Sequence, residues 1–202
     1  MSSPLRDAQF QKQLIWWNSA LPAFLIPYYW SQQQLGINPV EFVTRATGVL
    51  ALLFLVLTLL VTPLRKTLKW NWLLQHRRML GLYAFFYAFA HMLTYVAFDR
   101  AFKILTIPGD VWKRPFIALG MLSFFLMIPL AATSTNAMIK RLGGKNWMKL
   151  HRLTYICAVA GVAHYYLIVK SDITYPAIFG CVIVLLLGYR LYAVFSKETK
   201  SV

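Results

Sequence analysis

The hydrophobic positions of this chain fall into six long runs that are separated by short polar segments. A helix needs roughly 20 apolar residues to cross the hydrocarbon core of a membrane, and each run is close to that length. Two prolines, Pro22 and Pro27, interrupt the first run and make it the weakest, while Pro129 predicts a kink in the fourth. The pattern predicts an all-α integral membrane protein, a six-transmembrane-helix bundle with spans at residues 13–30, 46–64, 79–98, 115–139, 153–169 and 173–195.

Composition supports a membrane protein. Of the 202 residues, 59% are hydrophobic and 13% are charged, whereas a soluble domain carries about 25% charged residues. These proportions exclude a soluble globular domain and a disordered chain. The connections between the runs are short, with no Gly/Ser-rich linker and no evident repeat. We therefore expect a single domain over residues 1–202.

The net charge of +15 comes from 21 Lys and Arg against 6 Asp and Glu. Fifteen of the basic residues belong to the two termini, the second-to-third segment and the fourth-to-fifth segment, and six belong to the other three segments. Because cytoplasmic segments carry the excess of Lys and Arg, both termini are predicted to be cytoplasmic. The basic residues are expected to meet anionic lipid and not nucleic acid. On the outer side, segment 99–114 contains Pro108-Gly109 and is expected to form a small external cap.

All four histidines belong to the helices of the third and fifth spans: His76 and His151 stand just before these spans, and His91 and His164 lie deep in them. His91 follows Arg78 by 13 residues and His164 follows Arg152 by 12, which corresponds to about 20 and 18 Å of helix. Two neutral imidazoles at one depth on parallel helices can bind the two faces of a haem iron. Gly161, three residues before His164, is expected to clear space for the flat macrocycle.

Other interpretations of the deep histidines stay open. Each imidazole could instead form a hydrogen bond to a neighbouring helix. A metal site without porphyrin is less favoured, because no carboxylate or thiolate lies at that depth to complete the ligand set. Both cysteines, Cys157 and Cys181, fall inside apolar runs, which disfavours a disulfide framework and a zinc site.

The other two histidines lie at the cytoplasmic edge. His76 precedes His91 by 15 residues and His151 precedes His164 by 13. At about 100° per residue these intervals correspond to offsets of about 60° and 140°, which do not place His76 and His151 as a second pair on one inner face. His151 could bind a second, inner haem together with His76 or another partner, or both could be ordinary interface residues. Nearby basic residues could bind haem propionates or a flavin phosphate, with anchoring to lipid phosphate as the alternative. These residues are Arg77, Arg78, Lys149 and Arg152.

Several motifs resemble a known family. They are RRMLGL at 77–82 followed by an aromatic run to His91, ATS at 132–134, WMKLHRLTY at 147–155 with His164 downstream, and TPL closing the second span at 62–64. They are similar to the haem-binding membrane subunits of the bacterial protein-methionine-sulfoxide reductase system. That family (MsrQ) belongs to the ferric reductase-like transmembrane group, which also includes the NADPH oxidases. The resemblance covers about residues 10–195.

The resemblance implies a multi-pass b-type cytochrome of the bacterial inner membrane with one haem b or two. It implies electrons from the respiratory quinone pool, with a cytoplasmic flavin reductase also considered as donor. It further implies an acceptor, a periplasmic molybdopterin-dependent reductase that repairs methionine sulfoxide in envelope proteins, and the binding of FMN. His91 and His164 match the outer-haem ligands, and His151 matches a third histidine that haem binding requires. His76 has no counterpart in the family motif, and its spacing departs from the two-haem pattern of the oxidases.

Three rival functions remain at this point. A free-standing ferric or metal reductase would share the same core and differ in its acceptor. A small proton-coupled transporter would use the buried histidines as a proton relay, but it would need an aqueous path lined by further polar groups. A structural assembly factor would leave the matched depth of the histidines unexplained. Because the sequence contains no Gly-rich dinucleotide fingerprint, we expect an electron-transfer subunit without a substrate-reducing active site of its own.

Overall fold

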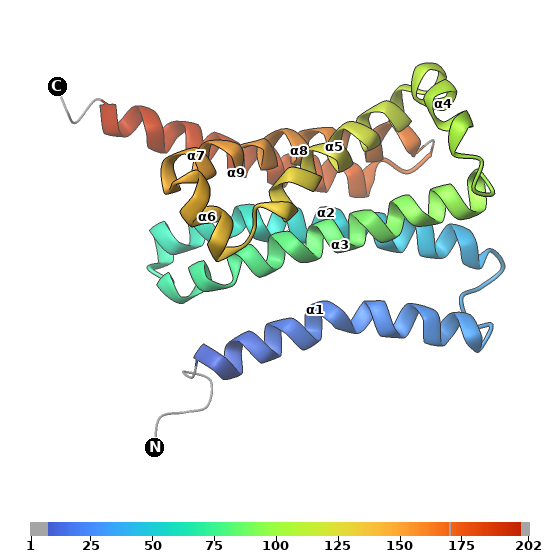
Figure 1. Ribbon diagram of the computed structural model, residues 1–202, viewed down its shortest axis with the longest axis horizontal. Coiled ribbons are helices and arrows are strands. Elements are labelled where there is room, and N and C mark those ends of the chain that lie inside the picture. Colours follow the sequence, from blue (N-terminus) through green and yellow to red (C-terminus); the bar gives the residue numbers. More distant parts are fainter. Residues whose placement is uncertain (1–7, 170, 199–202) are drawn as a thin grey trace.

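The computed structural model describes residues 8–169 and 171–198, and every element in that part of the chain is a helix. Six helices of 16 or more residues run up and down along the long axis (Figure 1). They are α1 (Ala8–Ser31), α2 (Pro39–Leu68), α3 (Arg77–Thr94), α5 (Pro115–Ala132), α8 (Leu153–Ile168) and α9 (Thr174–Glu198). The connections hold η2 (Asn71–Gln75), η3 (Tyr95–Asp99, one π-helical turn), η4 (Ile104–Thr106), α4 (Ile107–Lys113), α6 (Asn136–Leu142) and α7 (Gly144–Leu150).

Four segments are long and apolar enough to cross a membrane, judged by length and composition over the described residues. They are Pro39–Leu68, Arg77–Asp99, Pro115–Ala132 and Thr174–Ala193. The predicted first and fifth spans form helices α1 and α8 but lie outside this set. Helix α8 has 16 residues, which corresponds to about 24 Å and is shorter than a hydrocarbon core of about 30 Å.

Two predicted span ends differ from the ends of the helices. The fourth span does not continue to residue 139, because α5 ends at Ala132 and a separate helix, α6, begins at Asn136. The hydroxyl groups of Thr133 and Ser134 donate to the carbonyls of Pro129 and Leu130 at 2.7 Å and satisfy the last turn of α5. Pro129 therefore lies near the end of the helix and not at a kink within a longer span. The motif at 62–64 does not close α2 either, since that helix continues to Leu68.

The two ends of the bundle differ. The described ends of the chain, Ala8 and Glu198, lie at the same end as α6 and α7, while α4 lies at the opposite end (Figure 1). The predicted cap is a short helical segment, since residues 99–114 contain η4 and α4. Asp110 holds α4 in place, because its carboxylate accepts from the Tyr95 hydroxyl at 2.6 Å and pairs with Arg100 at 2.6 Å.

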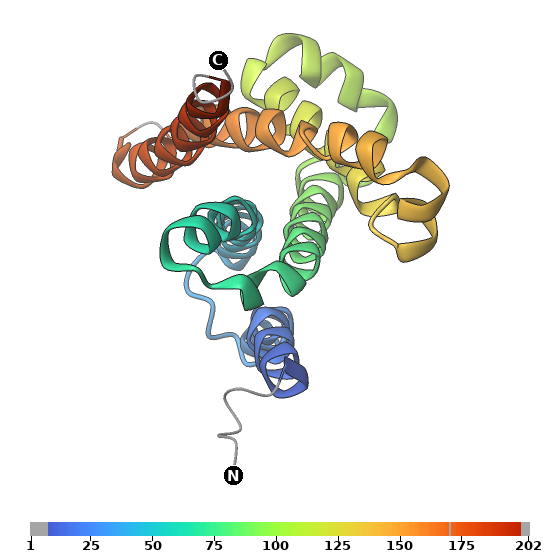
Figure 2. The same ribbon diagram turned by 90° about the vertical axis from the view of Figure 1, so that its left-hand side faces the viewer.

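Helix α2 lies in the core, with its residue Leu59 fully buried. It packs against α3 on one side and contributes to a second cluster with α8 and α9 on the other. Helix α1 is peripheral, with only Ser19 and Ala20 buried among its residues, and it lies at the edge of the end view (Figure 2). The hydroxyls of Tyr83 and Tyr87 attach it to α3 by donating to the carbonyls of Trp16 and Ser19.

Helix α9 is joined to α2 through a carbonyl that a proline leaves free. Residue 63, which would normally donate its N–H to the Leu59 carbonyl, is a proline without that N–H. Arg190 of α9 supplies the missing donor, with Nη2 at 2.7 Å from the Leu59 oxygen. Its Nη1 donates to the Tyr155 hydroxyl at 2.8 Å, and its guanidinium lies 5.0 Å from the centre of that ring.

The substitution Arg190→Met should destabilise the bundle, because it leaves the Leu59 carbonyl without a donor. We expect a loss of about 1–3 kcal/mol, the usual cost of an unpaired buried polar group, measured as a lower melting temperature in detergent. Lys66→Met, at an exposed position in the last turn of α2, is the matched control and should melt like the wild type. Adding Pro63→Ala restores an N–H to Leu59 and should recover part of the loss. If Arg190→Met and the double variant with Pro63→Ala lose the same stability, the bond between Arg190 and the Leu59 carbonyl would be contradicted.

Candidate functional site

The structure brings His91 of α3 and His164 of α8 together. Their ring centroids lie 6.0 Å apart, and the two ring planes are nearly perpendicular, at 78°. Helices α3 and α8 both start near α6 and α7 and run toward the α4 end (Figure 1). The expectation that these two histidines lie at one depth on parallel helices is thus met in the structure.

Both imidazoles are held in the same tautomer by a backbone carbonyl of a neighbouring helix. The Nδ1 of His91 lies 2.9 Å from the Thr44 oxygen on α2, and the Nδ1 of His164 lies 2.6 Å from the Phe116 oxygen on α5. A carbonyl oxygen only accepts, so each Nδ1 carries the proton and donates. Each neutral ring therefore keeps an unprotonated Nε2 with a free lone pair, which is the form that binds a metal.

The separation of the two rings suits one metal ion between them. An ion bonded to a nitrogen of each ring at about 2 Å would hold the ring centroids about 6 Å apart. Within the described residues, no group of three or more His, Cys, Asp or Glu side chains gathers around a possible ion. Two axial imidazoles without further protein ligands are the donor set that haem iron takes, because porphyrin fills the other four positions.

Gly161 does not have the predicted role. A side-chain carbon at this position would meet the Leu52 side chain at 3.5 Å and the Ser123 hydroxyl at 3.8 Å. Gly161 therefore faces α2 and α5 in ordinary helix packing. The prediction that it clears space for a macrocycle was wrong, because sequence spacing gives the helix face of a residue but not the neighbour that covers that face.

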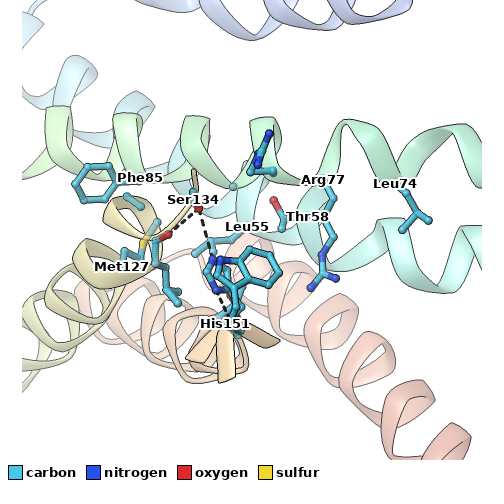
Figure 3. A pocket seen from close by; sticks show the side chains of 14 residues that line it. Leu55, Thr58, Leu74, Arg77, Phe85, Met127, Ser134 and His151 are labelled. Atoms are coloured by element: carbon cyan, nitrogen blue, oxygen red, sulfur yellow. Dashed lines mark hydrogen bonds between the residues drawn. The ribbon is translucent and has the colours of Figure 1, made fainter. Parts of the chain in front are cut away.

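A separate cavity of about 240 Å³ lies toward the α6 and α7 end, enclosed by α2, α3, α5 and α8 (Figure 3). Its lining residues include Leu55, Thr58, Arg77, Arg78, Gly81, Phe85, Met127, Ser134, Trp147, His151 and Thr154. Aromatic rings extend from this cavity toward the histidine pair. Phe85 stacks on Phe124 with centroids 5.9 Å apart, and Phe124 contacts Phe89, two residues before His91, at 6.4 Å.

His151 is the histidine of this cavity. Its ring stacks on Trp147 at 3.8 Å, its Nδ1 donates to the Trp147 carbonyl at 3.1 Å, and its Nε2 lies 3.5 Å from the Ser134 hydroxyl (Figure 3). Burial lowers the pKa of His151 below its ordinary value, the positive charge of Arg77 acts in the same direction, and the bond to Trp147 opposes both. His151 therefore enters the cavity as a neutral imidazole.

His76 is not brought to His151, and it does not line the cavity. It is buried, with its ring 5.8 Å from that of Trp72 and its Nε2 3.1 Å from the Gln75 amide. Burial and the positive charge of Lys12 lower the pKa of His76. Its Nδ1 is buried without a hydrogen-bond partner in the part of the chain that the structure describes.

The predicted basic residues separate into two groups. Arg77 and Arg78 line the cavity, and Nη1 of Arg78 donates to the Asn136 side chain at 2.6 Å. Arg77 makes no hydrogen bond or ion pair with any described residue, so its guanidinium is free to bind an anion. Lys149 and Arg152 are exposed and outside the lining. Sequence reasoning missed the carbonyls of Thr44 and Phe116, because a backbone acceptor leaves no trace in residue type.

Comparison with known proteins gives results that fit this arrangement. A family model described as ferric reductase like transmembrane component matches residues 47–162. A protein of Herminiimonas arsenicoxydans named "Protein-methionine-sulfoxide reductase heme-binding subunit MsrQ" is 46% identical over 192 residues, which cover 94% of this chain and 88% of that protein. A protein of the same name from Ralstonia nicotianae is 45% identical over 191 residues, with the same coverage of both chains. Magnetosome protein MamZ of Magnetospirillum gryphiswaldense is 40% identical over 187 residues, 90% of this chain and 29% of that longer protein.

The family match spans more than half of the chain, and the two MsrQ relatives match nearly all of it. The family is transmembrane and several described helices are long and apolar, as in a multi-pass membrane protein. The chain therefore belongs to the MsrQ family of ferric reductase-like transmembrane proteins.

Proposed function

We propose that this chain is a b-type cytochrome of the bacterial inner membrane that relays electrons outward to a periplasmic, molybdopterin-dependent methionine sulfoxide reductase. The observation that carries the proposal is the facing pair His91 and His164, whose ring centroids lie 6.0 Å apart. The names of the MsrQ relatives, which describe a heme-binding subunit of a protein-methionine-sulfoxide reductase, agree with the chemistry of the pair. Haem, when bound, supplies a one-electron couple at its iron.

In this proposal His91 and His164 would hold haem b by binding its iron through their Nε2 atoms. The carbonyls of Thr44 and Phe116 orient the rings and make their Nε2 atoms more basic. The ring of Phe116, 6.5 Å from that of His164, contributes to an apolar shell that keeps water from the site. These four residues come from four different helices, so the ligand geometry depends on the packing of the whole bundle.

We assign six membrane spans to the chain, with both termini in the cytoplasm. Helices α1 and α8 run alongside the four clearly apolar spans, and six antiparallel passes return the chain to the side where it began (Figure 1). The basic residues concentrate at the end that holds α6 and α7, as is usual for a cytoplasmic face. Glu41, Asp99, Asp110 and Asp172 lie at the α4 end, which is then periplasmic.

The inner cavity beside His151 would hold a second redox group, with a second haem b and FMN as the two candidates. Either has an anionic arm, and the Arg77 and Arg78 guanidinium groups would bind its carboxylate or phosphate. His76 has no part in this site, because it does not line the cavity. Electrons would enter at this end from the respiratory quinone pool, with a cytoplasmic flavin reductase as the alternative donor.

The α4 end would dock the periplasmic partner. Asp110 attaches α4 to the bundle, and this end presents Trp112 of α4 and Leu105 of η4, which are more than nine-tenths exposed. Methionine sulfoxide would be reduced on the partner, and this chain would supply the electrons that repair oxidised envelope proteins.

The substitution His164→Ala should abolish the haem absorbance of the outer site, because one axial ligand is lost. The protein should remain in the membrane, since the helices keep their apolar faces. The reduced-minus-oxidised visible spectrum of purified protein measures the effect. His76→Ala is the matched control and should keep its haem. Full haem content in His164→Ala would overturn the ligand assignment.

The angle between the imidazole planes predicts an electron paramagnetic resonance (EPR) spectrum. Perpendicular axial imidazoles leave two iron d orbitals nearly equal in energy, so the oxidised protein should give one strong low-field feature of highly anisotropic low-spin ferric haem. The 78° angle between the two ring planes supports this expectation. A resolved three-line spectrum typical of parallel imidazole planes would contradict the geometry.

The substitution His151→Ala should empty the inner site and leave the outer haem in place, because the two sites use different histidines. The amount of haem and flavin per chain should fall only by the group that the inner cavity binds. Met148→Ala, at an exposed position on α7, is the matched control and should bind both groups. Unchanged haem and flavin content in His151→Ala would exclude this histidine from cofactor binding.

A further inference from the structure

Two glycines lie directly against the two facing histidines. A side-chain carbon at Gly48 of α2 would lie 3.1 Å from Nδ1 and 3.2 Å from Cε1 of His91. At Gly120 of α5 the corresponding distances to His164 are 2.9 and 3.0 Å. Any side chain at these positions would push the imidazole away, and the push would be greater at Gly120. Each glycine thus allows an imidazole to lie against the backbone of the neighbouring helix.

Each glycine also lies one helical turn from the carbonyl that binds the same ring. Thr44 precedes Gly48 by four residues, and Phe116 precedes Gly120 by four, so each carbonyl and its glycine share one helix face. The carbonyl accepts the Nδ1 proton and the glycine leaves room for the ring to reach it. Carbonyl, glycine and imidazole therefore form one unit on a pair of helices.

This unit occurs twice with nearly the same spacing. Thr44, Gly48 and His91 on α2 and α3 are followed 72, 72 and 73 residues later by Phe116, Gly120 and His164 on α5 and α8. The two units face each other through their imidazoles. The repetition indicates that the histidines require a glycine beside them, because other glycines of the same bundle do not lie against a histidine ring. Gly81, for example, has only Thr58 atoms near its open side, at 3.8 and 3.9 Å.

We propose that Gly48 and Gly120 are positioning residues that fix the rotation of the two axial imidazoles and the strength of their Nδ1–H···O=C bonds. The inference rests on the proposed haem function and goes beyond it, since it assigns control of the haem's reduction potential to two residues that do not touch the iron. An imidazole with a strong bond at Nδ1 is a better electron donor and stabilises ferric iron. A methyl group that pushes the ring off its carbonyl weakens this bond and raises the reduction potential.

The test compares Gly48→Ala and Gly120→Ala with two control variants. The controls, both on α9, are Gly180→Ala, where the new methyl group would make ordinary contact with the Val162 side chain at 3.6 Å, and Gly188→Ala, where nothing lies within 4 Å. All are purified with haem, titrated for reduction potential and examined by EPR. We expect a higher potential and a shifted low-field EPR signal in the order Gly120→Ala, then Gly48→Ala, with both controls unchanged.

The outcomes separate the inference from the function on which it rests. Unchanged potential and EPR signal in haem-loaded Gly120→Ala would overturn the inference, while wild-type protein without haem would overturn the proposed function. If Gly120→Ala inserts and folds but binds no haem, the reduction potential and EPR signal of Gly48→Ala decide whether the inference holds. Loss of haem from both folded variants, with haem retained in Gly180→Ala, supports displacement of the rings. Failure of both to accumulate, while Gly188→Ala accumulates, would assign the glycines to helix packing and overturn the inference.

Discussion

Inside a bilayer a polar group must find its partner within the protein, and the two deep imidazoles meet this requirement with backbone carbonyls. The Nδ1 groups of His91 and His164 donate to carbonyls of Thr44 and Phe116 on neighbouring helices. One bond therefore satisfies a buried donor, selects the tautomer and leaves Nε2 free to bind a metal. Each of the helix pairs α2–α3 and α5–α8 carries one prepared ligand. The packing of the two pairs then sets the 6.0 Å between the rings.

The same requirement explains how the other helices attach. Pro63 leaves the Leu59 carbonyl without its usual donor, and Arg190 on α9 takes that place. The inner cavity is one exception, because Arg77 faces it without an anionic partner among the described residues, and the buried His76 Nδ1 and Arg190 Nε also have no hydrogen-bond partner among them. The bundle is thus internally satisfied around the histidine pair and open to an anion at its basic end. This asymmetry fits a fixed outer cofactor and an inner site that exchanges electrons with a donor.

The apolar runs and the depth of two histidines were enough to predict an all-helical membrane protein and to bring His91 and His164 together. The predicted fourth span ran past the end of α5 because it was read through the short polar run at 133–136, where the hydroxyls of Thr133 and Ser134 satisfy the last turn of the helix. The place of His76 also needed the structure, since it depends on packing against Trp72. The roles of Gly48 and Gly120 were not predicted, because the function of a small residue in an apolar run depends on the neighbour that packs against it. The repeat was missed for a related reason, as its units share a carbonyl, a glycine and an imidazole but little else.

The most direct test of this account is the dithionite-reduced minus oxidised visible spectrum of the detergent-purified protein, with haem and flavin quantified per chain. The paired imidazoles predict a sharp b-type α band and at least one haem per chain, because their ring centroids lie 6.0 Å apart and the Nδ1 bond of each ring leaves its Nε2 free to bind a metal. Protein produced with ample haem that shows no such band would contradict the account. The two deep histidines would then have to serve a different chemistry, of which proton-coupled transport is the first to examine.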